Sequence, residues 1–182
     1  ILSITQNKIY FHLANSAGTL INREMHYDMV RVGLAIYGYN PLKDRKNHLE
    51  LKPALSVKAK ITLIRDVPKG VGVSYGHNFI TQRTSRLAVV GIGYADGINR
   101  LLSGKISVIC NGELFPQVGA ITMDQMIIDI TNSSEIEVGN VVTLIGIQGK
   151  QAVSVNEWAT LSGLIPWEIL CGFKHRLPRV VI

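Results

Sequence analysis

The stretch SVKAKITL at residues 56–63 decides the fold of most of this chain. Its apolar side chains, Val57, Ala59, Ile61 and Leu63, alternate strictly with polar ones. A period of two residues predicts a strand of an antiparallel sheet that has one face in the core and one face in solvent. We therefore expect these four apolar side chains to share the core face.

Further strands follow this stretch along the chain. Apolar segments predict strands at residues 86–92, 106–110, 126–130 and 141–145. A turn at residues 68–70 ends the first strand, and Asn111-Gly112 predicts a type I′ hairpin before the segment 113–118. Ser154 and Glu157 have the spacing of a capping box, and Pro166 can begin a second helix that runs to Phe173. The region from about residue 53 onward is therefore predicted to be mainly β with two late helices.

The first forty residues have an α/β pattern. A short buried strand is predicted at residues 9–13, one or two helical turns within 18–27, and a nearly continuous apolar strand at 29–37. Apolar strands of this kind belong to parallel sheets that are covered on both faces. Two strands cannot close such a sheet, so we expect most of this unit to lie outside the chain. The polar residues 40–51 are interpreted as a linker.

Composition excludes several classes of protein. Of the 182 residues, 47% are hydrophobic and 18% are charged, which is typical of a globular protein and not of a disordered one. No apolar run has the length of a membrane span, and residues 1–4 lack both an initiator Met and a signal sequence, so a piece of a longer protein is expected. Two cysteines, Cys110 and Cys171, are expected to be reduced thiols of a cytoplasmic protein.

The charge pattern predicts neither nucleic-acid binding nor a metal site. The net charge of +6 comes from 19 basic and 13 acidic residues, and the basic ones are scattered without interleaved aromatic residues. The five histidines show no spacing typical of metal ligands. We therefore expect no nucleic acid and no metal as partners.

Polar residues at the ends of the first two strands are candidates for binding an anion. Ser16 follows a strand, at the edge where α/β barrels bind phosphate groups, although a plain turn is the alternative. Arg31 lies within an apolar strand, where a buried guanidinium is costly unless it is paired or bound to a cofactor. Gly33 lies on the same face of the strand as Arg31 and leaves space beside it for a flat group. His12, on the preceding strand, is placed to support the Arg31 side chain. An ion pair with a carboxylate in the part of the protein outside this chain is the alternative role for Arg31.

Two tyrosines lie among glycines at predicted strand ends. Tyr75 stands in GVSYG at residues 72–76, and Tyr94 in GIGYADG at residues 91–97. A tyrosine acts as a general base when a nearby cation lowers its pKa from about 10. The alternative is that each ring covers part of the core.

Taken together, six runs of sequence resemble the alanine racemase family, pyridoxal-phosphate (PLP) enzymes that interconvert L- and D-alanine. The runs are HLANSAG (12–18), RVGLAIYG (31–38), VSYG (73–76), GYADG (93–97), GAITMDQ (119–125) and RLPR (176–179). The resemblance implies an α/β barrel remnant plus a mainly-β fold. Residues 1–45 would be the last strands of a PLP-binding (β/α)8 barrel, and residues 46–182 the family's C-terminal β domain.

The resemblance also implies roles in cofactor binding. Ser16 would contact the PLP phosphate with help from the backbone of Gly33 and Leu34, and Arg31 would bind the pyridine nitrogen with His12 bracing it. Arginine does not give up its proton, so the ring nitrogen would stay unprotonated and would be a weaker electron sink. We expect that this favours racemisation over transamination.

The remaining roles concern the substrate. By resemblance, Tyr75 is the base on one face, the backbone of Met123 holds the substrate carboxylate, and Tyr94, Arg100 and Asp124 line the entrance. The base on the other face would be the lysine that carries the cofactor. No lysine of this chain sits in a matching context, so we expect the chain alone to be inactive. Family members are homodimers in which the β domain supplies Tyr75 and Met123 to the partner's barrel.

One residue departs from the pattern of the best-known members. His175 stands where a tyrosine that touches the phosphate is common, and a protonated imidazole can also bind phosphate. This position leaves a serine racemase of the same family open. A barrel-type PLP decarboxylase lacks support because its Cys-centred acidic loop is not found, and a non-catalytic β interaction module is the alternative from another class. The implied role is supply of D-alanine for cell-wall peptidoglycan.

Overall fold

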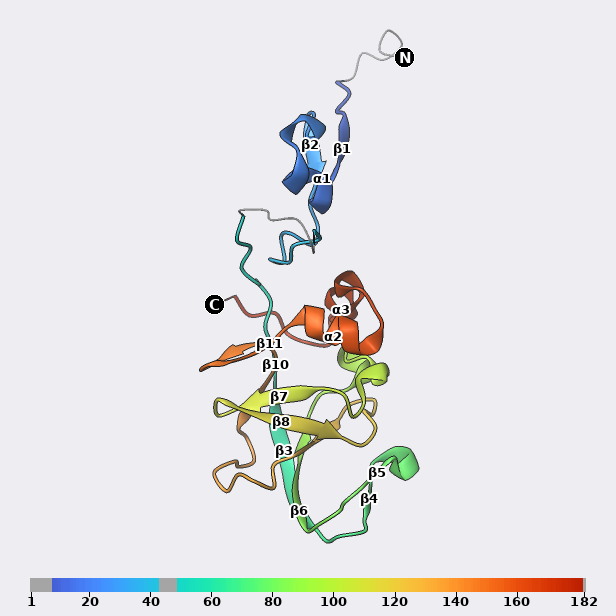
Figure 1. The fold of residues 1–182 in the computed structure, drawn as a ribbon, viewed down its shortest axis with the longest axis vertical. Coiled ribbons are helices and arrows are strands. Elements are labelled where there is room, and N and C mark those ends of the chain that lie inside the picture. Colours follow the sequence, from blue (N-terminus) through green and yellow to red (C-terminus); the bar gives the residue numbers. More distant parts are fainter. Residues whose placement is uncertain (1–7, 43–48, 182) are drawn as a thin grey trace. The chain divides into compact units, whose positions relative to one another are not determined.

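The computed structural model describes residues 8–42 and 49–181. The chain divides into two compact units, Ile1–Leu55 and Ser56–Ile182, which we call the N-terminal unit and the β domain (Figure 1). The boundary that the sequence predicts between residues 45 and 46 lies outside the described residues. Each unit is described by itself.

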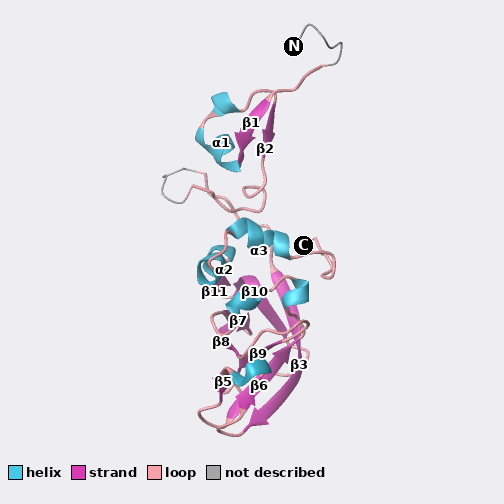
Figure 2. Ribbon diagram, turned by 90° about the vertical axis from the view of Figure 1, so that its right-hand side faces the viewer, coloured by secondary structure: helices cyan, strands magenta, loops and turns pink. Residues whose placement is uncertain are grey.

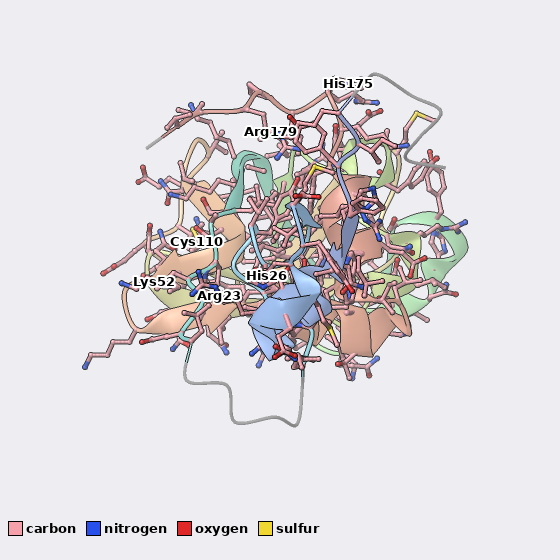
Figure 3. All side chains as sticks on the ribbon, turned by 90° about the horizontal axis from the view of Figure 1, so that it is seen from above. Arg23, His26, Lys52, Cys110, His175 and Arg179 are labelled. Carbon is pink, nitrogen blue, oxygen red and sulfur yellow. The ribbon has the colours of Figure 1, made fainter. Side chains whose placement is uncertain are left out.

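The N-terminal unit contains a parallel β-α-β arrangement. Strand β1 (His12–Asn15) pairs in parallel with β2 (Met29–Arg31), and the helix α1 (Ser16–Ile21) and a 3-10 turn (Arg23–Met25) connect them. The Asn15 side chain caps α1 by accepting a 3.0 Å hydrogen bond from the Gly18 N–H. His26, which is labelled in Figure 3, ties the connection to the helix, because its Nε2 lies 2.9 Å from the Thr19 carbonyl oxygen. The predicted α/β character of this segment is confirmed.

The prediction of a strand at residues 29–37 is correct for Met29–Arg31 and wrong for the residues after Arg31. Residues 33–38 form turns instead, with the Ile36 N–H donating to the Gly33 carbonyl and the Gly38 N–H to the Ala35 carbonyl. Gly38 has a φ of +82°, and a Cβ there would lie 1.9 Å from the Lys52 carbonyl oxygen, so the chain can turn here only with glycine. Within this run Leu34 is buried, whereas Ile36 is 68% exposed, so apolar content alone does not distinguish a buried strand from turns.

The strand predicted at residues 9–13 is shifted and more open than expected. β1 begins at His12, and Leu13 is 58% exposed. In the part of the chain that the structure describes, β1 and β2 pair only with each other, which leaves their outer sides uncovered. A parallel pair reaches full burial only within a larger sheet covered on both faces.

The β domain is built on one antiparallel sheet. Its seven strands run in the order β11-β10-β3-β6-β9-β8-β7, and an additional β10–β7 pairing closes the sheet on itself (Figure 2). The strands are β3 (Val57–Val67), β6 (Ser85–Val90), β7 (Ser107–Cys110), β8 (Glu113–Val118), β9 (Met126–Asp129), β10 (Val141–Gln148) and β11 (Gln151–Val153). The strands predicted within 56–63, 86–92, 106–110, 126–130 and 141–145 are therefore confirmed. β11 and the small hairpin of β4 (Gly72–Val73) and β5 (Phe79–Ile80) were not predicted.

The alternation along β3 breaks at a β-bulge. Ile61 pairs with Val90, but Leu63 pairs with the adjacent Val89, so one extra residue is inserted opposite β6. Val57 and Ile61 are buried, as predicted, whereas Leu63 is 42% exposed. The bulge reverses the faces of the following residues, and the partly buried Ile64 takes the inward place.

The predicted hairpin is present between β7 and β8. Asn111 and Gly112 have φ angles of +49° and +84°, which is the type I′ geometry that this residue pair favours. A core of large apolar side chains fills the closed sheet and the space under the helices, including Trp158, Ile92, Ile109, Met126, Ile128 and Leu144.

Both predicted late helices are present. α2 (Val155–Ser162) is capped by Ser154, whose hydroxyl oxygen accepts a 3.1 Å hydrogen bond from the Glu157 N–H. α3 (Pro166–Gly172) has Pro166 in its first turn, where the missing N–H costs nothing. Among the helices of the described ranges, none is long and apolar enough to cross a membrane.

Candidate functional site

The predicted phosphate-binding residues lie together at the carboxyl ends of β1 and β2. Asn15 and Arg31 are opposite each other in register, and Ser16 follows β1 directly. The buried Ser16 hydroxyl oxygen accepts hydrogen bonds from the Gly33 N–H (2.9 Å) and the Ala35 N–H (3.3 Å). The buried Leu34 lies between these two donors in sequence. The structure thus brings Ser16 to the backbone at residues 33–35.

The space beside Gly33 is open. A Cβ built on Gly33 finds no atom within 4 Å. Because the Ser16 oxygen acts as acceptor in both hydrogen bonds, its O–H remains available as a donor. The Gly33 N–H is used by Ser16, so the free hydroxyl donor and the open space beside Gly33 are the features here that suit a phosphate group.

Arg31 is exposed, which contradicts the burial expected from its apolar neighbours. It lies at the last position of β2, where the described residues do not cover the sheet. Within residues 8–42 and 49–181 it forms no ion pair, and the alternative of a pair with a carboxylate outside this chain stays a prediction. An exposed guanidinium with free donors suits a ring nitrogen or another acceptor of a bound cofactor.

His12 is opposite Met29 in the register of the parallel pair, and its side chain is exposed. Among the hydrogen bonds of the described residues, none joins His12 to Arg31. The bracing role of His12 therefore stays a prediction.

Tyr75 stands on a tight loop between β4 and β5. Its side chain is 75% exposed in a 3-10 turn (Tyr75–His77), and its neighbours Ser74 and Gly76 have φ angles of +63° and +75°. The Ser74 hydroxyl donates a 2.8 Å hydrogen bond to the Ala120 carbonyl oxygen. A Cβ on Gly119 would lie 2.8 Å from the Val73 carbonyl oxygen, so glycine allows the two segments to approach closely. These contacts fix the base of the loop that presents the phenol.

Met123 lies on the loop that continues from Ala120, and its side chain is 52% exposed. The Tyr94 N–H donates to the Thr122 carbonyl oxygen at 2.9 Å, and the Ala95 N–H donates to the Met123 carbonyl oxygen at 3.0 Å. A Cβ on Gly93 would lie 2.3 Å from the Thr122 carbonyl oxygen. The backbone therefore joins the segment with Tyr94 to the segment with Met123, a relation the sequence did not predict.

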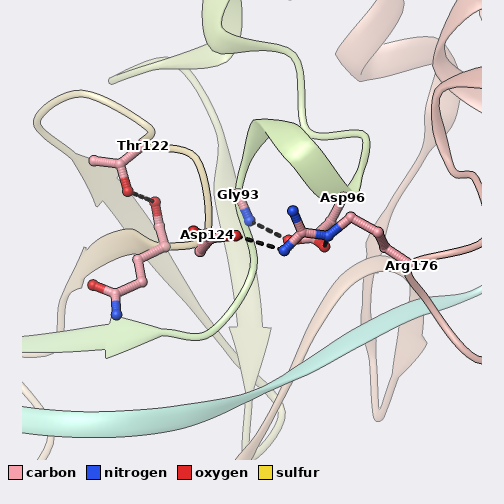
Figure 4. A network of polar contacts seen from close by, with 6 residues as sticks. Gly93, Asp96, Thr122, Asp124 and Arg176 are labelled. Carbon is pink, nitrogen blue, oxygen red and sulfur yellow. Dashed lines mark hydrogen bonds and ion pairs between the residues drawn. The ribbon is translucent and has the colours of Figure 1, made fainter.

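Arg176 binds carboxylates from both segments (Figure 4). Its Nε lies 3.1 Å from Asp96 Oδ1, and its Nη2 lies 2.5 Å from Asp124 Oδ1. The other Asp96 oxygen accepts a 2.9 Å hydrogen bond from the Gly93 N–H. The hydrogen bond to Asp124, followed by the attraction of Asp96, raises the pKa of Arg176 above its ordinary value. The sequence marked Arg176 only as part of a matching run, and Asp96 only as part of another.

Tyr94 and Arg100 border a cavity of about 580 Å³ beside α3. The lining residues are Tyr94, Gly97, Ile98, Asn99, Arg100, Leu164, Glu168, Ile169, Gly172 and Lys174. Asp124, the third residue predicted for the entrance, does not line this cavity and is instead held by Arg176. His175 is exposed and lies on the segment that follows α3. Figure 3 labels both His175 and Arg179 of this segment.

The site residues fall into the two units. Ser16, Arg31 and the backbone at Gly33 belong to the N-terminal unit, and Tyr75 and Met123 belong to the β domain. In the part of the chain that is described, no group of three His, Cys, Asp or Glu side chains could hold a metal ion.

A parallel β-α-β unit with polar residues at the carboxyl ends of its strands, followed by a closed antiparallel domain, defines a two-part protein of the α/β-plus-β class. The family model described as "Alanine racemase, C-terminal domain" matches residues 54–181, and that of the N-terminal domain matches residues 3–41. The chain belongs to the alanine racemase family. The predicted fold class, the end of a barrel followed by the family's β domain, is confirmed.

Similar proteins include the alanine racemases of two organisms. That of Prochlorococcus marinus is 66% identical over 174 residues, covering 96% of this chain and 45% of the relative. That of Synechocystis sp. is 55% identical over 171 residues, covering 94% of this chain and 46% of the relative. The chain thus spans a little under half the length of the curated relatives it matches.

Solved structures give the same result. The alanine racemase of Bacillus anthracis with bound L-Ala-P has a TM-score of 0.88 and 40% identity, covering 95% of this chain and 45% of that one. The enzyme of Bartonella henselae with covalently bound pyridoxal phosphate has a TM-score of 0.83 and 35% identity, covering 97% of this chain and 48% of that one.

Proposed function

We propose that this chain forms part of a PLP-dependent racemase that interconverts L- and D-alanine by moving the α-proton between two bases. The observation that carries the proposal is the 66% identity to the Prochlorococcus marinus alanine racemase, which extends over 96% of this chain. The exposed Tyr75 on its fixed loop and the free donors of Ser16 and Arg31 supply the chemistry that such an enzyme needs.

The residues of the N-terminal unit fit a phosphorylated pyridine cofactor. The Ser16 O–H and the backbone beside the open Gly33 and Leu34 would hold the phosphate group, and Arg31 would donate to the ring nitrogen. A guanidinium does not give up its proton in a protein, so the ring nitrogen would accept a hydrogen bond from it. His12 would orient Arg31, and His175 would give a further contact to the phosphate when protonated. PLP, when bound, supplies the electron-withdrawing ring that makes the α-proton of an amino acid removable.

The β domain would supply the groups that face the amino acid. Tyr75 Oη would take up or return the α-proton on one face of the amino acid. The Met123 backbone would bind the substrate carboxylate, and Tyr94, Arg100 and Asp124 would border the route to it. The base on the other face would be a lysine in the part of the protein that this chain does not include.

We further propose that the active site is shared between the two subunits of a homodimer. Ser16 and Arg31 belong to one compact unit and Tyr75 and Met123 to another, so the halves of the site are built independently. In this assembly Tyr75 and Met123 would act on the barrel of the partner. The two free cysteines suit the reducing cytoplasm, where D-alanine would be made for cell-wall peptidoglycan.

The proposal is tested on the full-length protein that contains this chain, loaded with PLP. L-Alanine and L-serine are incubated in D₂O, and loss of the α-proton and formation of the D-isomer are followed. Tyr75→Phe is expected to abolish D-alanine formation, whereas Tyr27→Phe, a change at a similarly exposed tyrosine, is expected to leave it intact.

Two other results would change the conclusion. A clear preference for serine would assign a serine racemase and direct attention to His175. The absence of exchange with either amino acid, in a folded protein that binds PLP, would contradict the racemase and favour a non-catalytic interaction module.

A further inference from the structure

The strongest unassigned feature of the β domain is the contact of Arg176 with Asp96 and Asp124, which we call the arginine clamp. We propose that Arg176 is a positioning residue that holds the loop of Met123 against the segment 93–97. The role in turnover rests on the proposed racemase function, whereas the clamp itself is a property of the fold. Neither the family resemblance nor the comparisons assign a role to Arg176.

Two backbone segments, at Gly97 and Gly172, approach each other closely and place Arg176 near its partners. Gly97 has a φ of +117°, and a Cβ there would lie 2.5 Å from the Gly172 carbonyl oxygen. Gly97 follows the segment with Asp96, and Gly172 ends α3. The crossing therefore brings the residues after α3 beside the loop they contact. Phe173 is buried directly after it, which anchors the start of the segment.

A second contact shapes the segment beyond Phe173. Arg179 Nη2 donates a 2.8 Å hydrogen bond to the Phe173 carbonyl oxygen, so the chain is folded back between these two residues. Arg176 lies within this fold and reaches Asp96 and Asp124 with adjacent nitrogens of one guanidinium group. The planar fork of arginine suits two acceptors at fixed positions, which a lysine ammonium cannot match.

The two carboxylates belong to segments that already share backbone hydrogen bonds. Tyr94 and Ala95 donate to the carbonyl oxygens of Thr122 and Met123, so the clamp adds a side-chain link beside a backbone link. The Thr122 hydroxyl and N–H both donate to the Gln125 carbonyl oxygen and close the turn that contains Met123. Without Arg176, the turn would be held to segment 93–97 by these two backbone bonds, and Asp96 and Asp124 would face each other without a counter-charge.

The two ion pairs of the clamp differ in exposure. The Arg176 side chain is 53% exposed and that of Asp124 57%, and an exposed ion pair adds little to global stability, whereas the Asp96 side chain is 10% exposed and is also held by the Gly93 N–H. The expected effect is therefore local. When a loop whose backbone binds the substrate carboxylate becomes more mobile, the affinity of the enzyme for the substrate falls. The rate of the chemical step for substrate that is already bound changes little.

The test uses the full-length holoenzyme with Arg176→Gln, Arg176→Lys and, as a matched control, Arg65→Gln. Arg65 is an exposed arginine of β3 without an ion pair among the described residues. We expect Arg176→Gln to raise KM for L-alanine about tenfold with kcat within about threefold of the parent. Arg176→Lys is expected to recover part of the loss, and Arg65→Gln to match the parent.

A second readout does not depend on activity. Amide hydrogen exchange at Tyr94 and Ala95 reports the backbone link directly, and it is expected to be about tenfold faster in Arg176→Gln than in Arg65→Gln. Asp124→Asn should reproduce both effects, and the double variant Arg176→Gln/Asp124→Asn should be no worse than Arg176→Gln alone, because both changes remove one contact.

Three outcomes would overturn the inference or separate it from the proposed function. If Arg176→Gln matched Arg65→Gln in KM and in exchange, the clamp would be an ordinary surface ion pair. If Arg176→Gln lost PLP or the dimer instead, Arg176 would serve assembly and not the Met123 loop. In the third outcome, the parent protein shows no racemisation while amide hydrogen exchange at Tyr94 and Ala95 is still faster in Arg176→Gln than in Arg65→Gln. That result would contradict the racemase proposal and support the structural role of the arginine clamp.

Discussion

The hydroxyl of Ser74 donates a 2.8 Å hydrogen bond to the carbonyl oxygen of Ala120, and so joins the loop of Tyr75 to the loop of Met123. Ser74 makes this bond from a left-handed backbone conformation, with φ at +63°. Two residues proposed to act on the same substrate thus share a support that neither of them touches with its own side chain. The consequences of this bond can be measured.

Ser74→Ala and Ser74→Gly separate the hydrogen bond from the backbone strain. Both lose the bond to Ala120, but glycine adopts a positive φ without a steric penalty. We expect Ser74→Ala to lower the free energy of unfolding by roughly 1–2 kcal/mol and Ser74→Gly by less. Urea denaturation of the full-length protein gives both values. A larger loss with glycine would show that backbone strain is not what distinguishes this position.

Gly97→Ala is expected to be among the most damaging small substitutions in the β domain. A Cβ at Gly97 would lie 2.5 Å from the Gly172 carbonyl oxygen, and the φ of +117° is unfavourable for alanine. Gly139→Ala is the matched control, because Gly139 has a φ of +93° but a Cβ there would meet no atom within 4 Å. We expect the loss at Gly97 to exceed that at Gly139 by about 1–3 kcal/mol. Equal losses in thermal denaturation would mean that the backbones of Gly97 and Gly172 separate easily.

The two cysteines are expected to differ in reactivity and in pH dependence. Burial raises the pKa of the Cys110 thiol above its ordinary value of 9.0, whereas Cys171 is exposed. In the native protein a thiol reagent should modify Cys171 quickly and leave Cys110 intact until the protein unfolds. Rapid modification of Cys110 under native conditions would contradict its burial.

The sign of the pH effect follows from the raised pKa. The unfolded thiol ionises first as the pH rises, so the unfolded state binds fewer protons and gains stability relative to the folded one. The contribution of Cys110 is complete below the unfolded pKa of about 9 and is lost as the pH rises through the folded value. Cys110→Ala should remove this part of the pH dependence, whereas Cys171→Ala should not.

The sequence predicted the regular parts of the β domain because their signals are local. Alternation along β3, the Asn111-Gly112 pair and the cap at Ser154 each depend on a few adjacent residues. The bulge before Leu63 was missed because it depends on pairing with β6 and not on the sequence of β3 itself. The apolar run after Arg31 misled for a related reason, since an apolar run does not by itself require a strand, and here it forms turns in which Ile36 is exposed.

The site was predicted in part by resemblance, and its supports were not predicted. Ser16 and the backbone at Gly33 lie together as expected. Arg176 and Asp124 are 52 residues apart, and no local pattern indicates that a guanidinium will reach that carboxylate. The burial expected for Arg31 was wrong because it was inferred from neighbours in sequence, whereas the described residues leave the outer sides of the two-stranded sheet uncovered.

The closed circuit of strands in the β domain limits where a foreign strand could add to the sheet. Because β10 pairs with both β3 and β7, the sheet has no long free edge running along its whole length. Among the described strands, the open backbone edges include those of the short β11 and of the part of β3 beyond Ile61, which pairs with β6 alone. Such an architecture discourages the sheet-by-sheet growth that leads to aggregates.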